Sequence, residues 1–256
     1  MKKIWSIISV ILVVLAVVFK VIIYSKGKQE LANLRQSAEQ GNADAQSNLG
    51  DLYFSGKSVS ANRAIAAKWY LKAAEQGDAY GQYNLGWMHA NGRGVPQSDT
   101  EAVKWYQSAA EQGVPEARYN LGLMYINGNG VKKNRHKALK LWKDAAEQGL
   151  AEAQFNLSLM YKLGDGVDID HELALRWARA AADQGHADAE YNLGSWYGVG
   201  DGIERDESEA FKWYLRAAKK GNENARLIVG VWTIWGKATD KDIPLGYAWL
   251  KMLNSE

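Results

Sequence analysis

Cysteine is absent from the 256 residues, and proline and histidine are scarce, with three and four copies. The lack of cysteine excludes disulfides, thiolate catalysis and cysteine-ligated zinc, although it leaves the cellular compartment open. No two of His89, His136, His171 and His186 have the three- or four-residue spacing that aligns zinc ligands on one face of a helix. The sequence therefore predicts no metal site and no cofactor.

Catalytic motifs are missing as well. No His-Glu-x-x-His zinc motif and no Gly-x-Ser-x-Gly nucleophile elbow occurs. Carboxylates such as Glu75, Glu111 and Glu147 return at a fixed interval, whereas a general acid or base is expected to be a singular residue. We therefore expect a protein that is not an enzyme. A hydrolase acting on cell-wall material is the alternative that these absences argue against.

Neither sign of charge dominates the chain. The formal net charge is +2, and setting aside Lys2, Lys3 and Lys20 near the N-terminus leaves 28 basic against 29 acidic residues. Binding of DNA or RNA requires a basic footprint on the protein surface. We therefore expect no nucleic-acid partner.

The sequence does contain one passage that is repeated along nearly its whole length. It reads Ala-Ala-Glu-Gln-Gly at residues 109–113, followed by Tyr-Asn-Leu-Gly at residues 119–122. Its closing glycine recurs every 36 residues without insertion or deletion, at Gly41, Gly77, Gly113, Gly149, Gly185 and Gly221. A register of this kind is typical of a solenoid, in which each repeat contacts only its neighbours.

Each repeat contains two helical patterns and no strand pattern. In the first repeat these predict helices over residues 43–55 and 62–76, since apolar residues follow helical spacing in both. The Gly-x-Gly loop between them, such as residues 92–94, follows a helix and not a strand, so it predicts a tight turn and no phosphate site. Residues 29–40 match only the second half of a repeat, which predicts a capping helix ended by Gly41.

A glycine recurs in the middle of the first helix of each repeat, except that Ser158 replaces it in the fourth. Because such a glycine costs about 1 kcal/mol relative to alanine, its recurrence predicts that another group packs closely against it. The expected neighbours are bulky pairs on the second helices, which we predict to be core residues: Trp69/Tyr70, Trp105/Tyr106, Leu141/Trp142, Trp177/Ala178, Trp213/Tyr214 and Trp249/Leu250.

The repeated text contains Asn-Leu-Gly-x-Met-Tyr at residues 120–125, together with Gly-x-Gly-Val, Ala-x-Lys-Trp-Tyr and Ala-Ala-Glu-Gln-Gly. In these motifs it resembles the Sel-one-like (Sel1-like) repeat, a relative of the tetratricopeptide repeat. The resemblance covers about residues 31–253, six units after a leading half, and the last unit departs most. It implies an all-α, right-handed superhelical solenoid of antiparallel helix pairs that grips another protein in its concave groove. Bacterial members are often secreted or associated with the envelope, and some are immunity proteins against toxins of rival cells.

The N-terminus carries a membrane signal. Residues 4–23 contain one charge, Lys20, and are long enough to cross a hydrocarbon core of about 30 Å as a helix. A cleaved signal peptide is the alternative, but bulky residues occupy the place of a small-x-small cleavage site. We therefore expect a single-pass inner-membrane anchor within residues 1–25, a capping helix over residues 26–41 and six repeats over residues 42–256, with the solenoid in the periplasm.

A partner-binding face is expected on the first helices, at offsets −5, −2, +2, +5 and +6 from the leucine of Asn-Leu-Gly. Aromatic and aliphatic anchors at these offsets suit a protein or peptide ligand. The predicted partner-binding residues are Tyr80, Tyr83, Trp87, Tyr119, Leu123, Phe155, Leu159 and Tyr191. The alternative for Tyr83, Tyr119, Phe155 and Tyr191, which are in phase, is packing between repeats.

These observations predict a non-catalytic module at the cell envelope that binds another protein. One hypothesis is an immunity protein that neutralises a secreted toxin or effector, with a single tightly bound partner. The other is an assembly or regulatory scaffold of an envelope complex, with several weaker partners. The sequence leaves both open.

Overall fold

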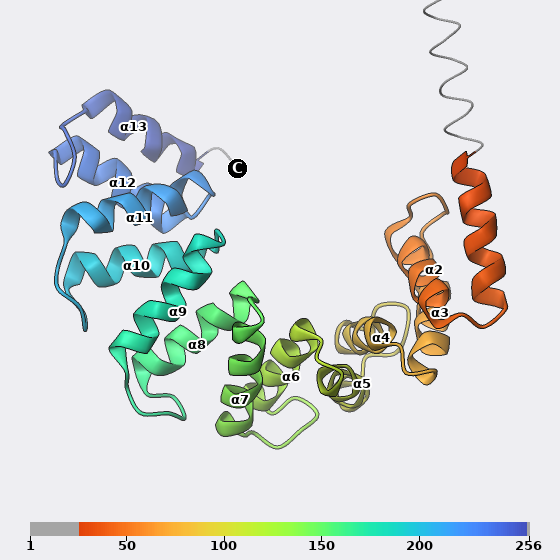
Figure 1. Ribbon diagram of the computed structural model, residues 1–256. Helices are drawn as coiled ribbons and strands as arrows, with labels where there is room; N and C mark the ends of the chain where they lie inside the picture. The colour runs from red at the N-terminus through yellow and green to blue at the C-terminus, as the bar shows by residue number, and fades with distance from the viewer. Residues whose placement is uncertain (1–25, 255–256) are drawn as a thin grey trace, which may run out of the picture. The chain divides into compact units, whose positions relative to one another are not determined.

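The computed structural model describes residues 26–254, and their regular structure is entirely helical (Figure 1). A helix over residues 26–39 comes first. It is followed by α2 (Ala43–Ser55), α3 (Arg63–Glu75), α4 (Ala79–Asn91), α5 (Asp99–Glu111), α6 (Pro115–Asn127), α7 (Arg135–Glu147), α8 (Ala151–Leu163), α9 (His171–Asp183), α10 (Ala187–Val199), α11 (Glu207–Lys219), α12 (Glu223–Trp235), α13 (Ile243–Lys251) and a final 3₁₀ turn, Met252–Asn254.

The helices form pairs, and the chain divides into two compact units. Unit 1 runs to Gln112 and contains α2 to α5, and unit 2 begins at Gly113 and contains α6 to α13. The even-numbered helices are called A helices below, and the odd-numbered helices from α3 onward are called B helices. Within each unit, every A helix packs on the B helix that follows it, and that B helix packs on the next A helix. The described chain is therefore a solenoid of helix pairs, as the 36-residue period predicted.

Local capping sets the helix ends. Every A helix ends at a glycine in the left-handed conformation, such as Gly56 with φ of 77°, whose amide donates to a carbonyl four residues earlier. Every B helix begins after a side chain that accepts a hydrogen bond from an amide three residues later; these caps are Asn62, Ser98, Asn134, Asp170, Asp206 and Asp242. Because each repeat carries these signals at the same positions, α2 to α12 all have 13 residues.

The turn between paired helices keeps its backbone conformation where the sequence loses a glycine. Gly94 and Gly202 have φ of 78° and 74°, and their counterparts in the first and last repeats, Ser58 and Ala238, have φ of 63° and 58°. These two are the positive-φ residues other than glycine in the described chain. The turn is therefore retained in the first and last repeats, where a residue other than glycine adopts the strained backbone conformation.

The A-helix glycines do lie against B-helix side chains. A Cβ added to Gly194 would lie 2.6 Å from Cδ1 of Tyr214, and one added to Gly86 would lie 2.9 Å from Cδ1 of Tyr106. The contacting residue is the second member of the bulky pair: Tyr70, Tyr106, Trp142 and Tyr214 are buried in the core, and Leu250 is half-buried. The first members Trp69, Trp105 and Trp177 are less buried: each is half-buried and packs against a core cluster. A lysine or arginine of the same helix lies over each of these rings.

A buried polar contact joins successive repeats. The side-chain amides of Gln46, Gln82 and Gln154 each donate to an alanine carbonyl of the preceding helix, at 3.0 to 3.2 Å. Each of these glutamines also accepts a hydrogen bond from a second glutamine, the one at the C-terminal end of the B helix in the same repeat, as in the 2.6 Å bond from Gln76 to Gln46. The contact satisfies polar groups that would otherwise be costly to bury.

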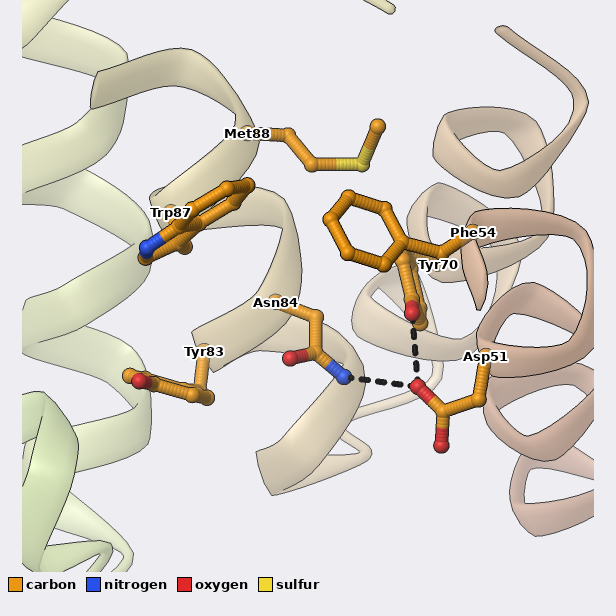
Figure 2. Close-up of a pocket in the computed structure, with 7 residues that line it drawn as sticks. All are labelled: Asp51, Phe54, Tyr70, Tyr83, Asn84, Trp87 and Met88. Atoms are coloured by element: carbon orange, nitrogen blue, oxygen red, sulfur yellow. Dashed lines mark hydrogen bonds between the residues drawn. The ribbon is translucent and has the colours of Figure 1, made fainter. Parts of the chain in front are cut away.

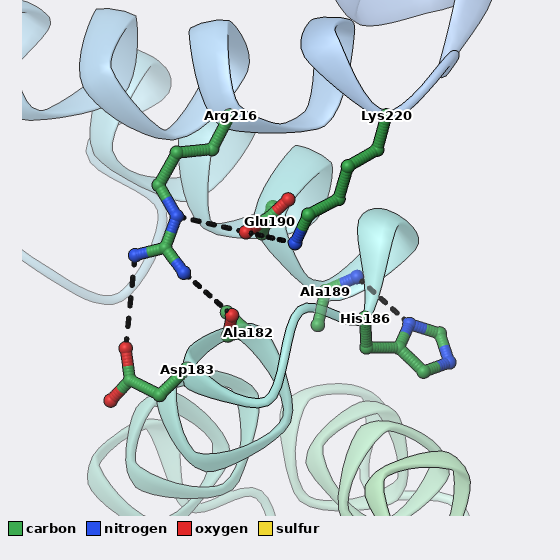
Figure 3. Close-up of polar contacts among 7 residues, drawn as sticks. All are labelled: Ala182, Asp183, His186, Ala189, Glu190, Arg216 and Lys220. Atoms are coloured by element: carbon green, nitrogen blue, oxygen red, sulfur yellow. Dashed lines mark hydrogen bonds and ion pairs between the residues drawn. The ribbon is translucent and has the colours of Figure 1, made fainter. Parts of the chain in front are cut away.

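The repeat of α10 and α11 replaces this glutamine pair with charged residues. Glu190 is fully buried, and its Oε1 accepts from Arg216 Nε and Lys220 Nζ, both at 2.8 Å (Figure 3). Arg216 also donates to the carbonyl of Ala182 at 2.8 Å, which is the bond that a glutamine makes in other repeats. Its guanidinium lies 3.8 Å from Asp183. This ion cluster is not among the features that the sequence pattern predicted.

The predicted membrane anchor, residues 4–23, lies outside the described residues. Within residues 26–254, no helix is both long enough and apolar enough to cross a membrane.

Candidate functional site

All eight predicted partner-binding residues lie on A helices. In unit 1, Tyr80, Tyr83 and Trp87 belong to α4. In unit 2, Tyr119 and Leu123 belong to α6, Phe155 and Leu159 to α8, and Tyr191 to α10. Tyr80 is 64% exposed, and the other seven are half-buried.

The four in-phase aromatic residues contact other rings. Tyr83, Tyr119 and Tyr191 lie beside the large B-helix residue of their own repeat, with centroid separations of 6.0, 6.2 and 5.7 Å. Phe155 instead stacks at 4.6 Å on His186, which caps the next A helix, α10. Burial raises the pKa of Tyr119, whose hydroxyl accepts a 3.4 Å hydrogen bond from Asn156. These rings therefore have packing roles within the solenoid, whether or not a partner contacts their exposed edges.

In unit 1, α2, α3 and α4 enclose a pocket of about 210 Å³ on the A-helix face (Figure 2). It is lined by Asp51, Phe54, Tyr70, Tyr83, Asn84, Trp87 and Met88. Two predicted residues, Tyr83 and Trp87, thus contribute to one pocket.

Asp51 organises the polar side of this pocket. Its Oδ1 accepts a 2.6 Å hydrogen bond from the hydroxyl of Tyr70 and a 3.4 Å bond from the amide of Asn84. Burial, and then the hydrogen bond to Asp51, raises the pKa of Tyr70 far above its ordinary value. Tyr70 therefore remains a donor, and Asp51 is held as the acceptor.

A second pocket, of about 310 Å³, adjoins the first because it shares Asp51 and Asn84. Its other lining residues are Asp44, Ser47, Asn48, Asp78 and Tyr80. The two pockets make a continuous acidic and aromatic surface on α2 and α4 that includes Tyr80, the most exposed of the predicted residues.

Unit 2 has a pocket at the equivalent place, two repeats later. It measures about 220 Å³ and is lined by Ile126, Trp142, Asn156, Leu159, Met160, Leu163 and Asp165. Ile126 corresponds to Phe54, and Leu159 corresponds to Trp87. Of the predicted residues, Leu159 lines this pocket and Leu123 does not. An exposed apolar row continues along the A-helix ends of unit 2, where Leu163, Val199 and Trp235 are 71%, 72% and 73% exposed.

Sequence reasoning missed the contribution of α2. Asp44, Asp51 and Phe54 occupy offsets −5, +2 and +5 from Leu49, the same offsets that selected residues in later repeats. Applying the offset rule to the first repeat would have found them. Asn84, at offset −1, belongs to the repeating Asn-Leu-Gly text, and its approach to Asp51 of the preceding repeat appears only in the packed structure.

The described residues do not include any group of three or more His, Asp or Glu side chains arranged to hold a metal ion.

Comparison with known proteins identifies the family. A model of the Sel1 repeat matches residues 43–78, 79–114, 115–150, 151–186 and 187–222. A protective antigen of uropathogenic Escherichia coli with this fold is 37% identical, with a TM-score of 0.83 over 88% of this chain. The match covers 48% of that protein, so this chain spans about half of its length. A Sel1 repeat protein of Oxalobacter formigenes is 34% identical, with a TM-score of 0.81 over 93% of this chain and 95% of its own.

More distant structures share the fold alone. An immunity protein of Pseudomonas aeruginosa is 22% identical, with a TM-score of 0.53 over 83% of this chain and 80% of its own. No curated protein sequence matches the chain. Five consecutive matched repeats, together with the two more similar structures, show that the chain belongs to the Sel1 repeat family.

Proposed function

We propose that the chain is a non-catalytic module that binds another protein on its A-helix face. The observation that carries this proposal is the common position of the pockets. The pocket of unit 1 and its equivalent in unit 2 both lie on this face and use the same positions of the repeat. Partly exposed rings and aliphatic side chains held by a rigid helical scaffold supply contact area to a protein partner at low entropic cost.

We further propose that the module acts at the cell envelope, anchored in the inner membrane by residues 4–23 with the solenoid in the periplasm. The length and low charge of that segment support the anchor. Alkaline carbonate extraction of membranes tests it, since an anchored chain stays in the membrane pellet. Recovery of the full-length chain in the supernatant would contradict the anchor.

An immunity role is the first form of this function. This role is supported by the family resemblance. The Pseudomonas aeruginosa immunity proteins are 22 to 23% identical to the chain, so their likeness extends to the fold alone. A scaffold for an envelope complex is the alternative. Crosslinked purification of the full-length chain from membranes separates them. One partner at a one-to-one ratio, toxic when expressed alone, supports immunity, whereas several substoichiometric envelope proteins support a scaffold.

The face itself is tested by Trp87→Ala combined with Leu123→Ala. Both side chains are half-buried on A helices, so we expect loss of partner binding with a helical melting curve close to that of the wild type. The matched control is Trp69→Ala with Leu71→Ala, which removes the same residue types from B helix α3. Binding that survives the A-helix variant, or that is lost equally in the control, would remove this face from the proposal.

A further inference from the structure

We infer that the pocket of unit 1 lined by Asp51, Phe54, Tyr83, Asn84 and Trp87 binds an arginine or lysine side chain of the partner. This inference rests on the proposed protein-binding function and names the chemistry of one contact. We call this site the cation pocket. It combines aromatic walls with a carboxylate, and these are the two groups that stabilise an organic cation in a protein.

The aromatic walls are held in place by packing. Phe54 meets Trp87 edge to face, with centroids 5.5 Å apart and ring planes at 86° (Figure 2). Trp87 is half-buried, so part of its ring faces the pocket. Several tryptophans of this chain have a lysine or arginine over the ring, but within the described residues no cation of the chain stacks on Phe54 or Trp87. These two rings therefore remain available to a cation from outside.

The carboxylate is positioned in advance. Both hydrogen bonds to Asp51 end on Oδ1, which leaves Oδ2 to accept from a ligand. Asp44 and Asp78 line the adjoining pocket, and within residues 26–254 no ion pair involves these two residues or Asp51. The surface is thus negative without an internal counter-ion, and it is complementary to a basic segment of a partner.

The pocket has room for such a head group. Its volume of about 210 Å³ is several times the share of one liquid water, about 30 Å³. The equivalent pocket in unit 2 has aliphatic residues where Phe54 and Trp87 stand, and Leu123 occupies the sequence position of Asp51. A preference for cations is therefore expected in unit 1 and not in unit 2, which provides an internal control.

The test uses the full-length chain in detergent micelles, labelled with 5-fluorotryptophan. The probes are N-acetyl-arginine methylamide, its lysine counterpart and N-acetyl-citrulline methylamide, which has nearly the shape of arginine without the charge. Fluorine NMR follows each tryptophan, and Trp87→Phe assigns the signal of interest. We expect the arginine or lysine probe to shift the Trp87 signal in a saturable way, and the citrulline probe to leave it unchanged.

Asp51→Asn is the decisive variant, because an asparagine oxygen still accepts from Tyr70 while the charge is lost. We expect its affinity for the cationic probes to fall about tenfold, with an unchanged melting temperature. Asp165→Asn is the control, because Asp165 lines the unit 2 pocket but is paired with Arg135, and it is expected to leave the affinity for the probes unchanged. Equal shifts with arginine and citrulline, or undiminished binding by Asp51→Asn, would overturn the inference.

Failure of this inference is distinguishable from failure of the proposed function. If the probes do not bind but Trp87→Ala with Leu123→Ala still abolishes partner capture, the cation pocket is wrong and the protein-binding face stands. If the probes bind as expected but that double variant retains its partner, the pocket binds free cations without contacting the partner. Both the proposed face and the assignment of the cation to the partner are then wrong.

Discussion

In every repeat but the fourth, an A-helix glycine packs closely against a large B-helix side chain. In the fourth repeat both members change: Ser158 stands at the glycine position and Ala178 at the aromatic position. Ser158 is fully buried, and its hydroxyl donates a 2.6 Å hydrogen bond to the carbonyl of Phe155. A small B-helix residue leaves space for a side chain on the A helix, so the two positions are coupled by volume.

This coupling predicts a double-mutant result in the fifth repeat. Gly194→Ser should cost about 1–3 kcal/mol of unfolding free energy, because its Cβ would overlap the ring of Tyr214, and Tyr214→Ala should cost about 3–5 kcal/mol by leaving a cavity. The double variant, which copies the fourth repeat, should be more stable than the sum of the two changes by about 1 kcal/mol. Urea denaturation followed by circular dichroism measures all four proteins. Strict additivity would show that the two positions are not coupled.

Tyr70 links packing to pH. Burial and Asp51 raise its pKa in the folded chain, whereas the unfolded chain has the ordinary value of about 10. Above pH 10 the unfolded state loses this proton and the folded state keeps it, so stability falls as the pH rises, by about 1.4 kcal/mol per pH unit for this residue. Tyr70→Phe removes this contribution to the pH dependence of stability. Urea denaturation between pH 9 and pH 11 should therefore give a shallower decline for the variant, and parallel declines would contradict the assignment.

One buried position on the A helices makes a polar contact in several repeats. Gln46, Gln82 and Gln154 serve in three repeats, and Glu190 serves in the fifth with Arg216 and Lys220. Glu190 Oε2 is buried and has no hydrogen-bond partner within the described residues. The charged version therefore depends on its two cations, since a buried carboxylate without a counter-ion is costly.

Removing one cation from this cluster is expected to cost more stability than replacing the charged pair by two glutamines. Arg216→Met should cost about 2 kcal/mol or more, because it removes one cation from Glu190 and the donor to Ala182. Glu190→Gln with Lys220→Gln places the glutamine pair of the other repeats at these positions while Arg216 keeps its bond to Ala182, and it should cost about 1 kcal/mol or less. Urea denaturation at constant ionic strength compares them. A double variant less stable than Arg216→Met would mean that the ion cluster stabilises the repeat beyond what the glutamine pair supplies.

Across the whole chain, we expect the stability of each helix to depend mainly on the helices next to it. Each helix contacts mainly the helices before and after it in the sequence, so perturbations should weaken with distance along the chain. Leu85 in α4 and Leu193 in α10 are both fully buried, one in each unit.

Hydrogen exchange of the two leucine variants tests this expectation. Leu85→Ala should lower the protection of amides in α2 to α5, by an amount corresponding to about 2–5 kcal/mol, and should leave α10 and α11 close to the wild type. Leu193→Ala should give the opposite pattern. A uniform loss of protection over both units in either variant would show that the chain unfolds as one cooperative body.

The sequence by itself determined the helix pairs, their register and the face that carries the pockets. These features depend on local signals, namely capping side chains such as Asn62, left-handed glycines such as Gly56 and the period of apolar residues, and such signals act within a few residues of one another. Two residues at these offsets, Trp87 and Leu159, line the pockets of unit 1 and unit 2, and their role in partner binding stays a prediction.

Only the tertiary structure decided which residues on that face act together. Asp51 and Asn84 are 33 positions apart, Asp51 and Tyr70 are 19 apart, and the cluster of Glu190 with Lys220 spans 30. A 36-residue period shows which positions are equivalent, but it does not show how far a side chain reaches into the next repeat or whether it meets a polar or an aromatic neighbour. Those outcomes depend on the volumes and donors that neighbouring repeats present to each other, and they are settled when the helices pack.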